Sequence, residues 1–161
     1  MRVGIGFDAH RFTPGRPLVL GGVTIPYPLG LAGHSDADVI LHALIDALLG
    51  AAAAGDIGRY FPPGEERYKG ISSLKLLEKT KAILDERGYR VVNVDAVVVL
   101  EEPWLSNYRD EMREKIATVL SMDIEEVSIK AKTTEGLGFT GRKEGIAAYS
   151  VALLEKVDGG N

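Results

Sequence analysis

The chain has 161 residues, a hydrophobic fraction of 45% and a formal net charge of −4. This length is typical of one domain with a conventional core, so we predict a single domain over residues 1–161. The excess of acidic residues argues against a nucleic-acid partner, because such proteins use a basic face to neutralise phosphates. The chain contains no cysteine, so any metal must bind imidazole or carboxylate groups.

The first residues, MRVGIGFDAHRF, contain neither the apolar core nor the cleavage site of a signal peptide. No later apolar run approaches the roughly 20 residues that span a bilayer. We therefore expect a soluble, cytoplasmic protein with no membrane partner.

The N-terminal part of the chain predicts a hairpin, a helix and a loop. Residues 2–7 have the pattern of a short strand, and residues 18–25 form a second extended segment with a central Gly-Gly pair. We expect these two segments to form a hairpin. Ser35 has the spacing of a capping box and precedes a helix that extends through Leu48. Residues 56–70, dense in Gly, Pro and charge, predict a mobile loop that can act as a lid.

The rest of the chain alternates helices and strands. We expect helices from Ser72 to Gly88 and over roughly residues 106–121. Strands are expected over residues 91–100, 127–133 and 145–156, although the last segment is apolar throughout and also fits a helical period.

These elements predict an α+β fold with a mixed four-stranded sheet, helices packed on one face, and the N-terminal hairpin. Two of the strands are apolar on both faces, yet three helices suffice to cover only one side of the sheet. The other face must therefore be buried by oligomerisation, or by the long N-terminal segment folding back over it.

Asp8 and His10 are candidate metal ligands. They lie two residues apart after a predicted strand, so their side chains point to the same side. His42 can supply a third ligand from the predicted helix, and one carboxylate with two imidazoles leaves the open position of a catalytic zinc site. Asp38 and Asp46 lie four residues on either side of His42, where one of them can orient the imidazole through its other nitrogen.

Each of these features also has a simpler interpretation. An Asp-x-His pair is common at protein surfaces, and a histidine in an alanine-rich helix is often a core residue. Asp38 and Asp46 also suit helix capping and solvation. The metal hypothesis depends on the combination, because all three histidines lie in the first 42 residues, close to acidic residues and helix starts.

Two segments have the composition of phosphate sites. His34 and Ser35 precede a predicted helix, where free backbone N–H groups attract phosphate. Residues 133–135, Thr-Thr-Glu, lead into the glycine-rich residues 136–142, whose backbone can approach a ligand closely. Hydroxyls beside a carboxylate suit a magnesium-bridged diphosphate, and a turn without a ligand is the alternative.

Three motifs follow one another along the chain: GFDAH at residues 6–10, HSDADVILHALIDALLGAAAAGDIG at residues 34–58, and KTTEGLGFTGRKEGIA at residues 132–147. In this order they resemble the 2-C-methyl-D-erythritol 2,4-cyclodiphosphate synthase family of the non-mevalonate isoprenoid pathway. The resemblance covers nearly the whole chain. It implies a homotrimer whose sheets face a central axis, with helices outside and an active site at each subunit boundary.

The resemblance also implies the cofactors and the substrate contacts. Zn²⁺ would bind Asp8, His10 and His42, while Mg²⁺ or Mn²⁺ would bind Glu135 and the substrate diphosphate; these four residues form the expected catalytic set. His34 and Ser35 would hold the substrate 2-phosphate, Asp56 and Gly58 its methylerythritol hydroxyls, and residues 100–106 and 133–135 of a neighbouring subunit the cytidine nucleotide. The remaining expected substrate contacts lie in these segments and the loops beside them: Phe61, Leu100, Pro103, Leu105, Lys132, Thr133, Thr134, Phe139 and Arg142.

The implied reaction is an intramolecular phosphoryl transfer. A 2-phosphate oxygen of 4-diphosphocytidyl-2-C-methyl-D-erythritol 2-phosphate attacks the β-phosphorus, which closes 2-C-methyl-D-erythritol 2,4-cyclodiphosphate and releases CMP. The enzyme is thus expected to be a phosphorus-oxygen lyase that needs no protein nucleophile. Positioning and charge neutralisation should contribute more than acid-base help.

The resemblance further implies a cavity on the trimer axis, lined by Arg142 and Glu144 with Phe7 and Phe139. Family members can bind isoprenoid diphosphates there. An intersubunit ion pair is the alternative role for Arg142.

Two segments depart from the family pattern. Trp104 follows Pro103 where the family usually has lysine, which removes a positive charge near phosphate, and Lys132 can compensate for it. Residues 61–65, FPPGE, lack the acid expected after Phe-Pro, so no role follows for residues 63–65.

Two other functions are open at this point. A phosphohydrolase would use the same metal residues with zinc-bound water as nucleophile. A catalytically silent trimeric binder of nucleotides or isoprenoid diphosphates would not require an open zinc position, so the intact metal residues favour an enzyme.

Overall fold

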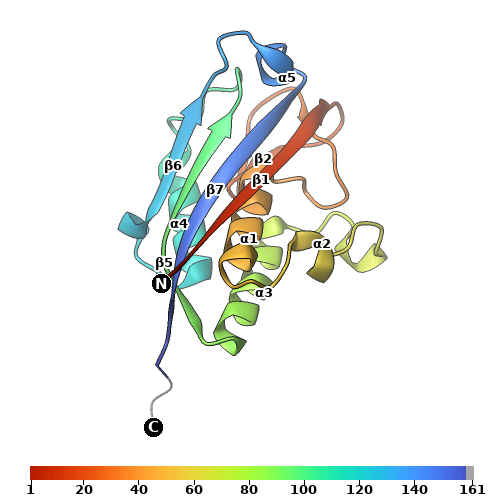
Figure 1. Ribbon diagram of the computed structural model, residues 1–161. Helices are drawn as coiled ribbons and strands as arrows, with labels where there is room; N and C mark the ends of the chain where they lie inside the picture. The colour runs from red at the N-terminus through yellow and green to blue at the C-terminus, as the bar shows by residue number, and fades with distance from the viewer. Residues whose placement is uncertain (159–161) are drawn as a thin grey trace.

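The computed structural model describes residues 1–158, and its main feature is a five-stranded sheet in the order β4-β1-β7-β5-β6 (Figure 1). β7 pairs antiparallel with both β1 and β5, whereas β5 and β6 are parallel and connected through α4. The strands of this sheet are β1 (Arg2–Thr13), β4 (Gly30–Leu31), β5 (Tyr89–Val99), β6 (Val127–Lys132) and β7 (Gly145–Lys156).

The α+β class and the mixed sheet are confirmed, but the sheet has five strands rather than four. The additional strand, β4, is only two residues long and pairs with Phe12 and Thr13 at the end of β1. The ambiguous segment 145–156 is a strand. Residues 159–161, which belong to the predicted domain, lie outside the described residues.

The N-terminal hairpin lies in a different place from the predicted one. Strands β2 (Leu18–Leu20) and β3 (Val23–Ile25) pair with each other across Gly21 and Gly22, which have φ values of 58° and 77°. These values lie in the left-handed region that favours glycine, and they suit a two-residue turn. β1 instead extends to Thr13 and pairs with β7 over ten residue pairs, so the expected hairpin between segments 2–7 and 18–25 is wrong.

Helices α1, α3 and α4 cover one face of the sheet (Figure 1). The helices expected near residues 72–88 and 106–121 are confirmed, and the loop after α1 contains a short helix and a 3₁₀ turn. The helical segments are α1 (Val39–Ala51), α2 (Ile57–Tyr60), α3 (Ser73–Glu86), α4 (Arg109–Leu120) and α5 (Gly138–Gly141), with 3₁₀ turns at Glu66–Tyr68 and Ile124–Glu126.

The first helix begins later than the capping box indicated. Asp38 is the N-cap of α1, and its carboxylate accepts a hydrogen bond from the backbone N–H of Leu41 at 3.1 Å. Ala37 has a φ of 57°, so the backbone turns away from a helical path just before Asp38. Ser35 is therefore not the cap of this helix, and its side chain is available for other contacts.

β1 packs unusually close to α1. A Cβ atom at Gly4 would lie 2.0 Å from the carbonyl oxygen of Ala47, and one at Gly6 would lie 1.8 Å from that of Ala43. Only glycine fits at these two positions, and the alanines of α1 complete the close contact. This packing places the second half of β1 beside the helical side chain of His42.

The opposite face of the sheet is apolar and exposed. On β1, Val3 and Ile5 are 70% and 71% exposed, and Phe7 is also exposed. On the neighbouring strand β7, Tyr149 and Val151 are exposed as well. No other segment among residues 1–158 covers these side chains. The alternative that the N-terminal segment folds back over this face is therefore wrong.

One further expectation concerns membranes. Among residues 1–158, none of the helices is long and apolar enough to cross a bilayer.

Candidate metal centre and substrate site

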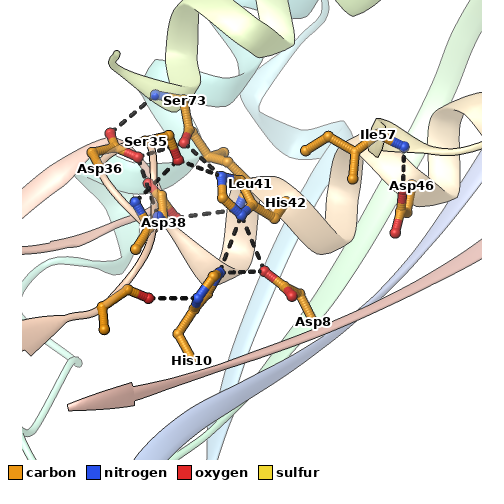
Figure 2. A network of polar contacts seen from close by, with 12 residues as sticks. Asp8, His10, Ser35, Asp36, Asp38, Leu41, His42, Asp46, Ile57 and Ser73 are labelled. Atoms are coloured by element: carbon orange, nitrogen blue, oxygen red, sulfur yellow. Dashed lines mark hydrogen bonds and ion pairs between the residues drawn. The ribbon is translucent and has the colours of Figure 1, made fainter. Parts of the chain in front are cut away.

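Asp8, His10 and His42 converge as the sequence predicted (Figure 2). The Oδ2 atom of Asp8 lies 2.8 Å from Nε2 of His10 and 3.1 Å from Nδ1 of His42, and these two ring nitrogens are 3.3 Å apart. Asp8 and His10 lie on β1 two residues apart, so both side chains leave the strand on the same side. The three groups can therefore hold one metal ion between the strand and the helix.

The second nitrogen of each imidazole has its own partner. Nδ1 of His10 lies 2.8 Å from the carbonyl oxygen of Ala32, which fixes that nitrogen as the N–H donor. Nε2 of His42 lies 3.1 Å from Oγ of Ser35 and 3.0 Å from Oγ of Ser73. The other nitrogen of each ring faces the Asp8 carboxylate. Two nitrogens and one carboxylate oxygen are a suitable donor set for a divalent cation.

The carboxylates of the two acidic residues that flank His42 in sequence do not hydrogen-bond to its imidazole. The Asp38 carboxylate is completely buried and accepts hydrogen bonds from both glycines of the β2–β3 turn and from the first turn of α1. Burial, together with the nearby charge of Asp36, raises the pKa of Asp38 to about 6 despite these bonds. Asp46 accepts a hydrogen bond from the N–H of Ile57 at 2.8 Å. The prediction that either residue orients His42 is therefore wrong.

Asp8 and His10 favour opposite charges. Burial alone would raise the pKa of Asp8, but hydrogen bonds and charge from His10 and His42 outweigh it and lower the pKa from 3.8 to about 2. Burial likewise opposes protonation of His10, but the hydrogen bond and charge of Asp8 leave its pKa above the ordinary 6.5. Each of these two side chains thus stabilises the charged form of the other.

A cavity of about 200 Å³ opens beside the candidate metal ligands His10 and His42. His34 and Ser35, which were expected to hold phosphate, lie in its wall. The predicted lid also contributes to the wall, where the rings of Phe61 and Tyr68 pack edge to face at 5.6 Å. The lining residues are His10, His34, Ser35, His42, Ile57, Gly58, Phe61, Pro63, Tyr68 and Leu76.

The segment 56–70 also contacts His34, one of the two residues expected to hold phosphate. Nε2 of His34 lies 2.7 Å from the carbonyl oxygen of Glu65. Asp56 is the N-cap of α2 and accepts the N–H of Arg59 at 3.1 Å, and it is absent from the lining of this cavity. Pro63 lines the cavity, although the sequence assigned it no role. The mobility of this segment stays a prediction.

A second cavity of about 100 Å³ lies between the loop after β5 and the end of β6. It brings together five of the expected substrate contacts, Leu100, Pro103, Leu105, Lys132 and Thr133. The exposed Trp104 and the cationic Arg109 complete it. The full lining is Leu100, Glu101, Pro103, Trp104, Leu105, Ser106, Arg109, Ala131, Lys132 and Thr133.

Glu101 connects this loop to the loop that carries Glu135. Its Oε1 atom accepts hydrogen bonds from the backbone N–H groups of Thr134 at 3.1 Å and Gly136 at 3.3 Å, and Oγ of Thr134 lies 3.4 Å away. Glu135 itself is exposed with a φ of 53°. Glu101 was not singled out from the sequence, because its partners lie more than 30 residues away.

The two cavities share no lining residue, and Glu135 does not join the Asp8 group in the described part of the chain. Within a single copy, the metal-binding half and the nucleotide half of the expected site therefore lie apart from each other.

Comparison with known proteins identifies the family. The model of the YgbB family matches residues 1–155. The chain belongs to the YgbB family. A relative from Moorella thermoacetica, a 2-C-methyl-D-erythritol 2,4-cyclodiphosphate synthase, is 61% identical over 154 residues, which cover 96% of this chain and 94% of the relative. The resemblance to this synthase family is confirmed.

Two solved structures are also similar to this chain in fold and sequence. The bifunctional IspDF from Campylobacter jejuni is 42% identical with a TM-score of 0.94, and the match covers 98% of this chain but 42% of that one. The IspF of Plasmodium falciparum, solved as a CDP complex, is 34% identical with a TM-score of 0.85, covering 98% and 97% of the two chains.

Of the residues expected along a trimer axis, Phe7 lies on the exposed sheet face and Phe139 does not. The ring of Phe7 packs 4.9 Å from that of Tyr149, and Phe139 lies in a separate hollow with His10. Nε of Arg142 pairs with Oε1 of Glu144 in the same chain at 3.0 Å. The ion pair of Arg142 is thus formed within one copy, and its role toward a ligand is a matter for proposal.

Proposed function

We propose that this chain is a 2-C-methyl-D-erythritol 2,4-cyclodiphosphate synthase. It would convert 4-diphosphocytidyl-2-C-methyl-D-erythritol 2-phosphate to the cyclic diphosphate with release of CMP, as a metal-dependent phosphorus-oxygen lyase. One observation carries the proposal: Asp8, His10 and His42 converge beside a cavity that contains His34 and Ser35. The identity of 61% to a synthase of this name supports it.

We assign Zn²⁺ to Asp8, His10 and His42, since two imidazoles and one carboxylate leave an open position for a substrate oxygen. Mg²⁺ or Mn²⁺ would bind Glu135 together with the substrate diphosphate, because both cations prefer oxygen ligands. Cations bound there would neutralise charge on the phosphates and polarise the reacting phosphorus.

The side chains around the first cavity then orient the substrate. Ser35 and His34 face the expected position of the 2-phosphate, and His34 is held by the backbone of Glu65 at 2.7 Å. Asp56 and Gly58 would contact the methylerythritol hydroxyls. The aromatic wall that includes Phe61 excludes water, so that the 2-phosphate oxygen rather than water reaches the β-phosphorus.

The cytidine diphosphate part of the substrate would occupy the second cavity. Lys132 and Arg109 supply positive charge there, and Lys132 would replace the lysine that the family usually has at position 104. Leu100, Pro103 and Leu105 would flank the base. The solved CDP complex of a relative with the same fold supports a cytidine nucleotide as ligand.

A homotrimer would join the two half sites. The two cavities of one chain share no residue, so a second copy is needed to bring Glu135 and the nucleotide loop to the metal site. The exposed apolar side chains of β1 and β7 offer the surface for that contact, because patches of this kind mark protein interfaces. Phe7, Phe139 and Arg142 would then line the axial cavity, which suits an isoprenoid diphosphate.

Incubation with the cytidyl substrate, followed by phosphorus NMR, tests the proposal. A synthase gives the cyclic diphosphate and CMP, and a chelator abolishes turnover. Linear phosphates would instead identify a phosphohydrolase, and binding without turnover would identify a silent binder. His42→Ala is the matched variant, and it should lose both bound zinc and turnover.

A further inference from the structure

We propose that Asp36 and Ser73 are positioning residues for His42, and that they fix which ring nitrogen of His42 keeps its proton. The inference deepens the proposed function, since it depends on the metal site assigned to Asp8, His10 and His42. It rests on a chain of hydrogen bonds from the Asp36 carboxylate through the Ser73 hydroxyl to Nε2 of His42 (Figure 2).

The direction of this chain follows from its first member. A carboxylate can only accept hydrogen bonds, so the Ser73 hydroxyl must donate its proton to Oδ1 of Asp36. The oxygen of Ser73 is then left as an acceptor, 3.0 Å from Nε2 of His42. Nε2 must therefore carry a proton, and Nδ1 is the nitrogen whose lone pair can face a cation beside Asp8.

The arrangement around Asp36 leaves little freedom. Its Oδ2 atom accepts the backbone N–H of Ser73 at 3.0 Å, and its Oδ1 atom also accepts the N–H of Asp38 at 3.2 Å. Ser73 is completely buried at the start of α3. Because the carboxylate is bound on both oxygens, it holds the Ser73 hydroxyl in one orientation.

The hydroxyl of Ser35 has a different role from that of Ser73. Its oxygen accepts the backbone N–H of Ala37 at 3.2 Å, and it lies 3.1 Å from Nε2 of His42. With the proton on Nε2 directed to Ser73, the Ser35 hydroxyl keeps its own proton for a ligand. Ser35 lines the cavity and Ser73 does not, which matches a division of roles: Ser73 orients the metal ligand and Ser35 donates to phosphate.

Zinc affinity is the first test, measured on chelator-treated protein by competition with a chromophoric chelator. Ser73→Ala should bind zinc about 10-fold to 100-fold more weakly, the range typical for loss of a group that orients a metal-bound histidine. Asp36→Asn places an NH₂ group against either the N–H or the hydroxyl of Ser73, and should weaken zinc binding in the same direction. Ser35→Ala should stay within about twofold of wild type in zinc affinity while its KM rises.

Nuclear magnetic resonance measures the exchange of the His42 ring proton with water, which would not change if Ser73 had only a structural role. The chain has only three histidines, so ¹⁵N labelling of histidine resolves the ring protons of the zinc-loaded protein. The Nε2–H proton of His42 should exchange slowly with water in wild type and Ser35→Ala, and rapidly in Ser73→Ala. The Nδ1–H proton of His10, bound to the carbonyl of Ala32 at 2.8 Å, is the internal control and should stay protected in all variants.

The outcomes separate this inference from the metal assignment. Wild-type protein that binds no zinc overturns the assigned metal site and this inference together. Wild-type binding with unchanged zinc affinity in Ser73→Ala, or with a protected His42 proton in that variant, overturns the inference alone. A loss of zinc affinity in Ser35→Ala equal to that in Ser73→Ala would also contradict it.

Discussion

The Nε2 atom of His10 lies 2.8 Å from the Oδ2 atom of Asp8, and each residue stabilises the charged form of the other. The pKa of Asp8 is about 2 and that of His10 lies above 6.5. A histidine with a raised pKa contributes stability below its ordinary pKa, and this contribution is lost as the pH rises through the folded-state value. A cation needs the neutral imidazole, so it competes with the proton that Asp8 stabilises.

We therefore predict that apparent zinc affinity rises with pH across the neutral range. Below the pKa of His10, each decrease of one pH unit should weaken zinc binding by up to about tenfold, because one proton must leave this imidazole before the metal can bind. The metal-free chain should lose stability over the same rise in pH, while the zinc-bound chain gains it. Competition titrations at several pH values from 6 to 8 measure this, and a flat affinity profile would contradict the pairing.

Because β1 packs closely against α1, we predict that adding one methyl group at Gly6 destabilises the protein. Gly6→Ala would place a Cβ atom 1.8 Å from the carbonyl oxygen of Ala43, so the strand or helix must shift. We expect a loss of about 3 kcal/mol or more in the free energy of unfolding, since overpacking of this kind strains the backbone. Because Asp8 follows on the same strand, zinc affinity should also fall.

Gly50→Ala is the matched control for that variant. A Cβ atom at Gly50 would lie 3.9 Å from the carbonyl oxygen of Ile5, which is an ordinary contact, and the residue is exposed within α1. Alanine is favoured over glycine inside a helix by up to about 1 kcal/mol, so this variant should be neutral or more stable. Urea unfolding measures both changes, and equal losses in the two variants would refute the packing argument.

The candidate metal ligands could be predicted from the sequence because their geometry is local in part. The spacing of Asp8 and His10 fixes their common side on any strand, and only the approach of His42 needed tertiary structure. The partners of His42 could not be predicted in the same way. Ser73 and Asp36 are 37 residues apart, and Ser73 appears in the sequence as one more serine at a helix start.

The prediction that Asp38 orients the imidazole of His42 was wrong for a specific reason. Helical spacing puts a residue four positions before His42 on the same face only if the helix already includes that residue. Asp38 instead lies at the N-cap after a left-handed Ala37, so its carboxylate turns toward the β2–β3 turn. The sheet order has a similar limit, because the partner of β1 is the last strand of the chain and no local pattern identifies it.

Lys132 is predicted to supply the positive charge that Trp104 does not. Lys132→Thr should raise KM for the cytidyl substrate about tenfold or more, with a smaller change in kcat, because a charged contact to phosphate contributes roughly 1.5–3 kcal/mol. Lys130→Thr is the control, since Lys130 lies two residues earlier on β6 and pairs with Asp95 at 2.6 Å outside the cavity. Steady-state kinetics measure both, and an unchanged KM in Lys132→Thr would dispose of the idea.

Glu101 is predicted to hold the loop of Glu135 in place. Glu101→Ala would remove the acceptor for the N–H groups of Thr134 and Gly136, so the loop should become less ordered. We expect the Mg²⁺ concentration for half-maximal activity to rise several-fold while zinc affinity stays constant. Glu102→Ala is the control, because its carboxylate pairs with Lys143 at 2.8 Å instead. An equal Mg²⁺ requirement in both variants would argue against this role.

The exposed face of β1 and β7 is predicted to form the contact between copies. Ile5 is 71% exposed in one chain and lies opposite Val151 in the sheet. Ile5→Glu would bury a charge without a partner in that contact, so the protein should elute as single 17.4 kDa chains rather than as trimers. Turnover should fall together with assembly, because Glu135 of a second copy is then missing from the site.

Thr118→Glu is the control, because it adds the same charge on the exposed side of α4 and should leave both assembly and turnover unchanged. If the Ile5 variant stays trimeric and active by size-exclusion chromatography with light scattering, another surface must join the two half sites.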